Sequence, residues 1–117
     1  LDKGWREGSP GFSAVVVNPA RRDWRVVAEK HPAHRLVLTS AMDHGIGQMF
    51  AAYEAALAYQ ENPERVDLCG LCTQHLFEPD GFFERLSSPG GHLRPDLSGG
   101  GLGFGDVLER LPWRKLQ

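Results

Sequence analysis

Two cysteines and a set of histidines are the residues of this sequence whose types and spacing could do chemistry. Cys69 and Cys72 have the spacing Cys-x-x-Cys, and His34 precedes them in the chain. This spacing lets both sulfurs face one point at a turn, as two ligands of a tetrahedral zinc ion require. With His34 they would leave one coordination position open, as in catalytic zinc sites, where a bound water becomes a nucleophile. We therefore predict a Zn²⁺ site at His34, Cys69 and Cys72.

Other arrangements of these residues stay open at this point. His75 with Cys69, Cys72 and either His31 or His34 would form a closed, structural zinc site. The two cysteines could equally be ordinary thiols that bind no metal. A redox pair of the thioredoxin type is disfavoured, because the cysteines lack the strand and helix context of that fold.

A second candidate site lies near the end of the sequence. Arg110, Trp113, Arg114 and Lys115 form a small basic and aromatic patch. Such a patch can contact an RNA backbone and stack on a base, so these four residues are predicted to bind nucleic acid. The simpler alternative is a solvated end of a helix.

Composition limits the class of protein that could carry these sites. The 117 residues include 13 Lys and Arg against 15 Asp and Glu, a net charge of −2, and 41% of them are hydrophobic. We expect a flexible lead-in over residues 1–11 and one domain over 12–117. The charge disfavours a nucleic-acid binder that acts alone. No apolar run is long enough to cross a membrane. A single pair of closely spaced cysteines indicates a reducing compartment, the cytoplasm or nucleus.

The apolar pattern predicts the elements that position these residues. Residues 12–30 fit a β-hairpin with strands at 12–17 and 24–28. Residues 33–60 fit a helix, because apolar residues recur there every three or four positions, at Leu38, Met42, Ile46, Met49, Tyr53 and Leu57. A short strand at 65–68 and a last short element at 106–111 follow. The predicted core, where sheet and helix meet, is Val15, Val17, Val27, Leu38, Met42, Ile46, Met49 and Leu57.

The order of hairpin, histidine at a helix start, strand and Cys-x-x-Cys resembles the cytidine deaminase-like fold of zinc nucleoside and tRNA deaminases. Their His-x-Glu motif corresponds to His34-Arg35-Leu36, and their Pro-Cys-x-x-Cys motif to residues 68–72. Within this family the chain is most similar to the catalytically degenerate partner subunit of the eukaryotic wobble-adenosine tRNA deaminase. The motifs that carry this similarity are His31-Pro32-Ala33-His34, Gly100-Gly101-Leu102-Gly103 and Leu111-Pro112-Trp113. The resemblance implies an α/β fold: one layered domain with a central mixed sheet flanked by helices, and one bound Zn²⁺.

The catalytic position of that family is altered in this sequence. Leu36 stands where active deaminases have the glutamate that moves the proton, and Leu68 replaces the proline before the first cysteine. The resemblance therefore implies a zinc-binding pseudo-enzyme subunit, inactive alone. It would support adenosine-to-inosine editing of tRNA in a heterodimer with a paralogous catalytic deaminase subunit. Two other interpretations stay open: a small accessory subunit of a larger organellar or ribosomal complex, and an independent zinc enzyme with another acid–base residue.

Overall fold

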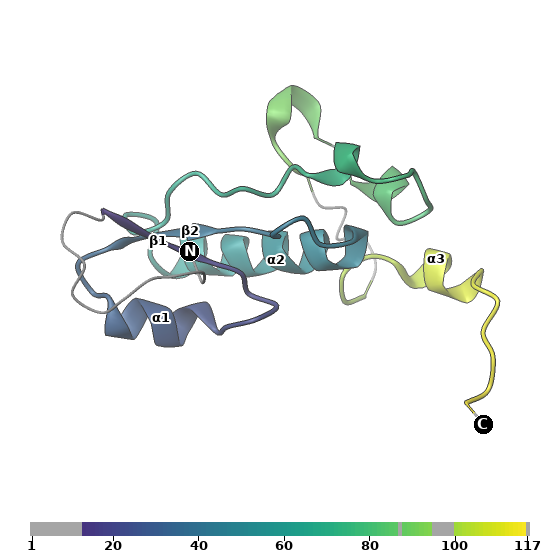
Figure 1. Ribbon diagram of the computed structural model, residues 1–117, viewed down its shortest axis with the longest axis horizontal. Coiled ribbons are helices and arrows are strands. Elements are labelled where there is room, and N and C mark those ends of the chain that lie inside the picture. The colour runs from purple at the N-terminus through teal and green to yellow at the C-terminus, as the bar shows by residue number, and fades with distance from the viewer. Residues whose placement is uncertain (1–12, 87, 95–99, 117) are drawn as a thin grey trace.

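Short parallel strands organise the fold (Figure 1). The computed structural model describes residues 13–86, 88–94 and 100–116. Strand β1 (Ala14–Val17) pairs in parallel with β2 (Arg35–Leu38), and Val17 lies opposite Leu38. Single parallel bridges join Leu36 to Val66 and Thr39 to Gly70. Residues 65–70 therefore occupy the position of a third strand beside β2, and the strand positions follow one another in space in chain order.

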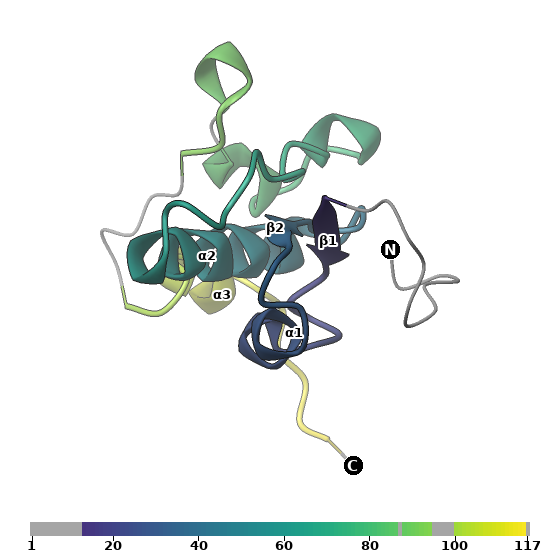
Figure 2. The ribbon, with the colours of Figure 1, turned by 90° about the vertical axis from the view of Figure 1, so that its left-hand side faces the viewer.

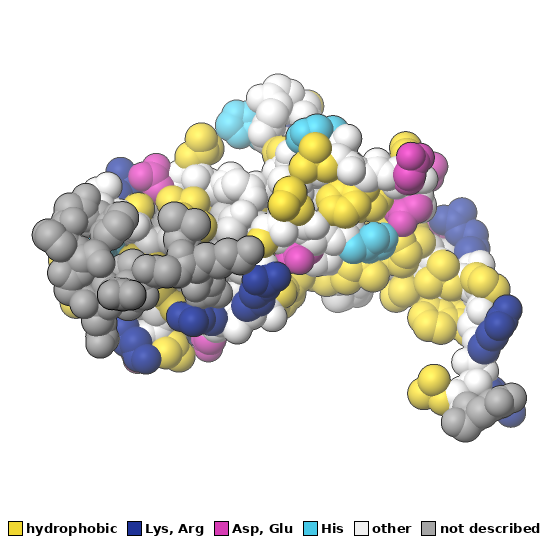
Figure 3. Space-filling view, in the orientation of Figure 1, with side chains coloured by type: hydrophobic (Ala, Val, Ile, Leu, Met, Phe, Trp, Pro, Cys, Tyr) yellow, Lys and Arg dark blue, Asp and Glu magenta, His cyan; other side chains and the backbone are white. Residues whose placement is uncertain are grey.

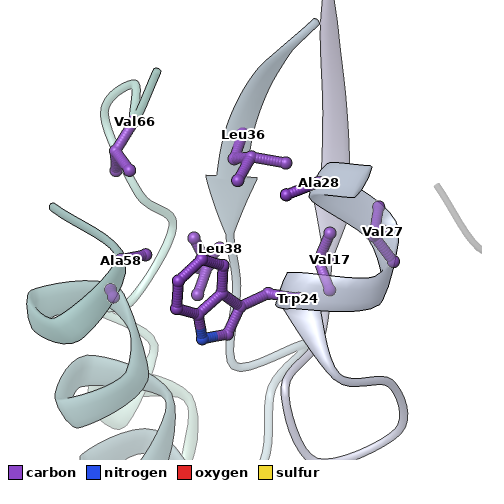
Figure 4. Packing of buried hydrophobic residues seen from close by; sticks show 9 residues of the cluster. Val17, Trp24, Val27, Ala28, Leu36, Leu38, Ala58 and Val66 are labelled. Carbon is purple, nitrogen blue, oxygen red and sulfur yellow. The ribbon is translucent and has the colours of Figure 1, made fainter. Parts of the chain in front are cut away.

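Two helices connect these strand positions and cover one face of the strands. Helix α1 (Trp24–Lys30) joins β1 to β2, and α2 (Gly45–Glu61) leads from β2 to the third strand position. Side chains alternate between the two faces of a strand, and Val17, Leu36 and Leu38 lie in the cluster that both helices contact (Figure 4). The helices and the third strand position complete this buried cluster with Trp24, Val27, Ala28, Ala55, Ala58 and Val66.

A second buried cluster forms near the start of α2. The later part of the chain folds into three short 3₁₀-helices, η1 (Gln74–Leu76), η2 (Phe83–Arg85) and η3 (Pro89–Gly91), and the helix α3 (Gly105–Glu109). The three 3₁₀-helices lie on the side of the strands away from α1 (Figures 1 and 2). Hydrophobic side chains gather over the start of α2 and around α3 (Figure 3). The buried members of this cluster are Met49, Phe82, Phe83, Leu86, Phe104 and Val107.

The predicted hairpin is wrong in its second half. β1 is confirmed, but residues 24–30 form a helix instead of a returning strand. The Asp23 side chain accepts a hydrogen bond from the backbone N–H of Arg25 at 2.9 Å, which caps the first turn of α1. Trp24, Val27 and Ala28 then fall on one helix face, at spacings of three and four, and are buried there.

The predicted helix over residues 33–60 divides into β2 and α2. Leu36 and Leu38 are buried whereas Arg35 is exposed, which is the alternation of a strand. Met42, expected in the apolar stripe of the helix, lies in the loop between the two elements and is 63% exposed. The buried face of α2 is lined mainly by small side chains, at Ala51, Ala52, Ala55 and Ala58. The predicted end of the helix at residue 60 agrees with the end of α2 at Glu61 to within one residue.

The predicted core is confirmed only in part. The buried positions are Val17, Val27, Leu38 and Met49, the half-buried ones are Val15 and Leu57, and the exposed ones are Met42 and Ile46. The α/β class is confirmed, although the sheet of the described residues is parallel rather than mixed. The predicted lead-in over residues 1–11 lies outside the described residues. Within the described ranges, no helix is both long and apolar enough to cross a membrane.

Candidate functional site

The carboxyl ends of the parallel strand positions meet at one edge of the sheet, where α/β proteins place their binding sites. Asn18 directly follows β1, Thr39 and Ser40 directly follow β2, and Thr73 follows the third strand position. Helix α2 also begins at this edge (Figure 1). The topology thus brings polar side chains from three separate parts of the chain to one place.

Hydrogen bonds join these side chains into a network, here called the edge network and consisting of Asn18, Ser40, Asp43, Gln48 and Thr73. Asn18 Nδ2 donates to Asp43 Oδ2 at 3.3 Å, and Gln48 Nε2 donates to the Asp43 carbonyl at 3.1 Å. Gln48 Oε1 accepts from the Thr73 backbone N–H at 3.3 Å. The hydroxyls of Ser40 and Thr73 are 3.2 Å apart. Asn18 is 8% exposed, and Ser40 and Gln48 are both 0% exposed. Burial favours these bonds, because an unpaired buried polar group destabilises the fold.

The loop between β2 and α2 has an unusual backbone. Ala41 and Met42 have φ of 49° and 61°, in the left-handed region that residues with a side chain seldom adopt. Thr39 fixes the start of this loop: its hydroxyl accepts from the Ala41 N–H at 3.2 Å and donates to the Gly70 carbonyl at 3.1 Å. Such strained residues cluster at functional sites. The strain therefore supports the assignment of this edge as the candidate site.

Gly47, in the first turn of α2, makes room for Asp43. A Cβ at residue 47 would lie 2.6 Å from the Asp43 Cβ, which is closer than two non-bonded carbon atoms approach each other in proteins. An alanine there must displace the aspartate that Asn18 binds, and overpacking of this kind typically destabilises by about 1–3 kcal/mol. A Cβ at Gly105, in the first turn of α3, meets nothing within 4 Å.

Gly47→Ala is therefore expected to destabilise the chain by about 1–3 kcal/mol, although alanine is intrinsically the better helix former. Gly105→Ala, the matched control, should be neutral or stabilising by up to about 1 kcal/mol. Urea unfolding measures both values, and the side-chain amide resonance of Asn18 should move only in the Gly47 variant. Equal stability of the two variants would show that Asp43 does not occupy this position.

His44 and Asp80 form a hydrogen-bonded pair beside the edge network. His44 precedes the first residue of α2, and its Nε2 lies 2.9 Å from Asp80 Oδ2. Asp80 Oδ1 also accepts from the backbone N–H groups of Phe82 and Phe83, both at 2.9 Å. Partial burial raises the pKa of the Asp80 carboxyl. These hydrogen bonds, from Phe83, His44 and Phe82, and the nearby charge of His44 outweigh it, so that the net pKa lies below the ordinary value.

The structure places the predicted zinc ligands at two different ends of β2. His34 precedes β2, at the amino end, and its Nδ1 is buried without a hydrogen-bond partner. Cys69 and Cys72 flank the bridge of Gly70 to Thr39, which follows the carboxyl end of β2. Among the described residues, no three His, Cys, Asp or Glu side chains come together to hold a metal ion. The zinc site stays a prediction.

Both cysteines are free thiols that donate to backbone carbonyls. Cys69 Sγ lies 3.3 Å from the Asp67 oxygen, and Cys72 Sγ lies 3.2 Å from the Gly91 oxygen. Burial raises the pKa of the Cys69 thiol. A thiol with a raised pKa is a weak nucleophile at neutral pH, so Cys69 as placed here is suited to packing rather than to redox chemistry.

The predicted nucleic-acid patch lies on α3 and the tail that follows it. Arg110 donates through Nη2 to the Asp106 carboxylate at 3.0 Å, one turn back along α3. Trp113 Nε1 donates to the Leu108 carbonyl at 2.6 Å, and its ring is largely exposed. Arg114 and Lys115 are exposed in the tail. Nucleic-acid binding by these four residues stays a prediction.

Sequence reasoning missed most of the edge network. The predicted hairpin puts Asn18 in its turn, and the sequence pattern assigns no role to Ser40, Gln48 or Thr73. A signal for two of them was present, because Asn18 and Ser40 each come at or near the end of a short run rich in Val and Leu. Parallel strands end at a common edge, so polar residues at such positions are candidates for one site. Gln48 and Thr73 carry no comparable signal.

Comparison with known proteins points away from the deaminases. No family model matches the chain. Over 111 residues, or 93% of the chain, it is 32% identical to o-succinylbenzoate synthase from Bdellovibrio bacteriovorus. The chain spans about a third of the length of that protein, 33% of it.

The resemblance to the cytidine deaminase-like family is therefore wrong. The similarity that covers nearly all of the chain is to a synthase of another kind. The motifs that carried the resemblance were short, and two of them depended on local structure that is absent. The first strand does not return as a hairpin, because residues 24–30 are helical. His34 precedes a strand rather than a helix, so it does not occupy the helix start that the deaminase pattern requires.

Proposed function

We propose that this chain supplies the carboxylate-binding edge of an α/β enzyme that makes o-succinylbenzoate. The observation that carries the proposal is the edge network, five polar residues from three parts of the chain at the carboxyl ends of parallel strands. Binding sites of α/β proteins lie at this edge. The similarity to o-succinylbenzoate synthase over 93% of the chain supports the choice of reaction.

The strand order favours a particular architecture for such an enzyme. Neighbouring strand positions follow in chain order, and the connecting helices pack on one face. This is the arrangement of β/α barrels, whose active sites lie at the carboxyl ends of the strands. A complete barrel needs about 250 residues. The chain would then contribute one part of the barrel wall and one part of the active-site rim.

The chemistry of the edge suits a carboxylate ligand. As its name states, o-succinylbenzoate is a benzoate that carries a succinyl group, so it is an anion with strong hydrogen-bond acceptors. Amide and hydroxyl side chains such as those of Asn18 and Thr73 are donors to such groups, and the fully buried Ser40 contacts the Thr73 hydroxyl. Asp43 is the only carboxylate among the five members of the edge network. The network is therefore suited mainly to bind and orient a ligand.

Production of o-succinylbenzoate tests the proposed function. The protein would be expressed in a bacterium that lacks its own o-succinylbenzoate synthase, and the product would be measured by mass spectrometry. We expect product in these cells and none in cells with an empty vector. A folded, well-expressed protein that yields no product would contradict the proposal and favour the accessory-subunit interpretation.

Asn18→Ala tests the part played by the edge network. The change removes a donor at the edge, and a hydrogen bond to a charged group contributes about 1.5–3 kcal/mol. We expect o-succinylbenzoate to bind the purified variant about 10- to 100-fold more weakly, measured by calorimetry. Asn62→Ala, at the exposed far end of α2, is the matched control and should bind as the wild type does. Unchanged affinity in a folded Asn18→Ala protein would remove the edge network from the site.

A further inference from the structure

The loop between β2 and α2 contains a tight turn whose residues disfavour its backbone conformation. The Asp43 N–H donates to the Ser40 carbonyl at 3.0 Å, which closes a four-residue turn. Both central residues, Ala41 and Met42, have positive φ. Positive φ at both central positions is typical of type I′ turns, in which glycine, asparagine and aspartate dominate because most other side chains are strained there. The turn therefore needs contacts from the rest of the fold to keep its shape.

Gln48, in the first turn of α2, supplies such a contact from inside the protein. Its Nε2 donates to the carbonyl of Asp43, the last residue of the turn, at 3.1 Å. Its Oε1 accepts from the backbone N–H of Thr73, beyond the third strand position, at 3.3 Å. The side chain is fully buried, so these bonds form where water does not compete for them. One amide thus joins two loops that are far apart in the chain.

The other contacts to the turn act at different places. Asn18 binds the side chain of Asp43, and the Thr39 hydroxyl accepts from the N–H of Ala41, near the start of the turn. Within the described part of the chain, Gln48 is the member of the edge network that bonds to the backbone at the exit of the turn. It is carried by a helix whose next residue, Met49, is 1% exposed in the second buried cluster. The amide is therefore held firmly enough to oppose the strain.

We propose that Gln48 is a positioning residue of the candidate site. It keeps the turn at residues 40–43 in its strained conformation and at a fixed place beside Thr73. The proposal rests on the proposed function, because it assigns Gln48 to the same edge of the sheet. Gln48 is fully buried and contacts no ligand itself.

The turn sets the shape of the site because members of the edge network begin and end it. Ser40 contacts the hydroxyl of Thr73, and Asp43 binds Asn18. When the Gln48 amide is removed, the two central residues of the turn are free to relax to negative φ, and these contacts separate. Only the fraction of molecules that still holds the turn then binds the ligand, so the apparent affinity falls by that fraction.

The test begins with Gln48→Met, which removes the amide and keeps a side chain of similar length. We expect o-succinylbenzoate to bind this variant about 10- to 100-fold more weakly, as measured by calorimetry. Glycine adopts positive φ without strain, so adding Ala41→Gly removes the reason for the turn to relax. The double variant should bind within about threefold of the wild type. Ala33→Gly, at an exposed residue without positive φ, is the matched control and should restore nothing.

A residue that only stabilises the fold would give a different result. Gln48→Met should lower the temperature of thermal unfolding in either case, because it leaves a carbonyl and an N–H group without their partner. With a purely structural role, the protein that remains folded would bind o-succinylbenzoate as the wild type does. Ala41→Gly would then have no effect on affinity. Affinity and its specific recovery at residue 41 therefore distinguish positioning from stability.

Amide hydrogen exchange tests the Gln48 bond in the wild-type protein, without ligand or variant. The Thr73 N–H should exchange at least about 10-fold more slowly than the same amide in an unfolded chain. Unprotected exchange at Thr73 would overturn the proposal even if Gln48→Met failed to fold. Wild-type affinity in folded Gln48→Met, or equal recovery with Ala41→Gly and Ala33→Gly, would overturn it while leaving the proposed function in place. Wild-type protein that binds no o-succinylbenzoate would overturn the proposed function, and the role of Gln48 in ligand binding with it.

Discussion

Leu38→Ala is expected to destabilise the chain by about 2–5 kcal/mol, the usual range for a leucine deleted from a core. Leu38 is 0% exposed and lies in the cluster between the strands and both helices. It ends β2, directly before the Thr39 and Ser40 side chains of the candidate site. The cavity left by the change would therefore loosen the edge network as well as the core. Chemical unfolding monitored by circular dichroism gives the free energy.

Leu68→Ala is the matched control for this change. Leu68 is 82% exposed, beside the same part of the sheet, so its loss should alter stability by less than about 0.5 kcal/mol. Similar effects of the two substitutions would contradict the placement of β2 in the core. They would favour the predicted long helix over residues 33–60, which would not place Leu38 between α1 and α2.

Trp24→Ala is expected to have an effect of similar size, about 3–5 kcal/mol. Trp24 is 5% exposed and packs where α1 faces α2 (Figure 4). Its indole N–H donates to Glu54 Oε2 of α2 at 2.8 Å, so one side chain supplies both apolar contact and a hydrogen bond to a carboxylate. Loss of the side chain removes both contributions.

Two further variants separate these contributions. Trp24→Phe keeps most of the apolar surface but not the bond to Glu54, and we expect it to destabilise by about 1–3 kcal/mol. Trp113→Ala is the control, because Trp113 is 70% exposed and should matter by less than about 1 kcal/mol. Thermal unfolding of the three variants measures the ranking. A larger effect at Trp113 than at Trp24 would show that α1 does not pack as described.

The sequence alone determined the class of the fold and several element positions. The run of β-branched residues over 14–17 predicts a strand because such side chains fit a pleated surface, and β1 is there. Asn62 and Pro63 predict the end of a helix because the residue before a proline avoids the helical conformation, and α2 ends at Glu61. These features depend on local chemistry, which the sequence contains in full.

The tertiary structure alone decided the direction of the sheet and the place of the site. Residues 24–28 and 35–38 are short apolar runs that fit a helix or a strand equally well, and their length gives too little periodicity to choose. Only the packing of α1 on β1 and β2 makes the first helical and the second extended. Because α1 forms a crossover connection between β1 and β2, the two strands run parallel. A parallel sheet brings Asn18, Ser40 and Thr73 to one edge. Residues far apart in the chain form this site, so no local motif marks it.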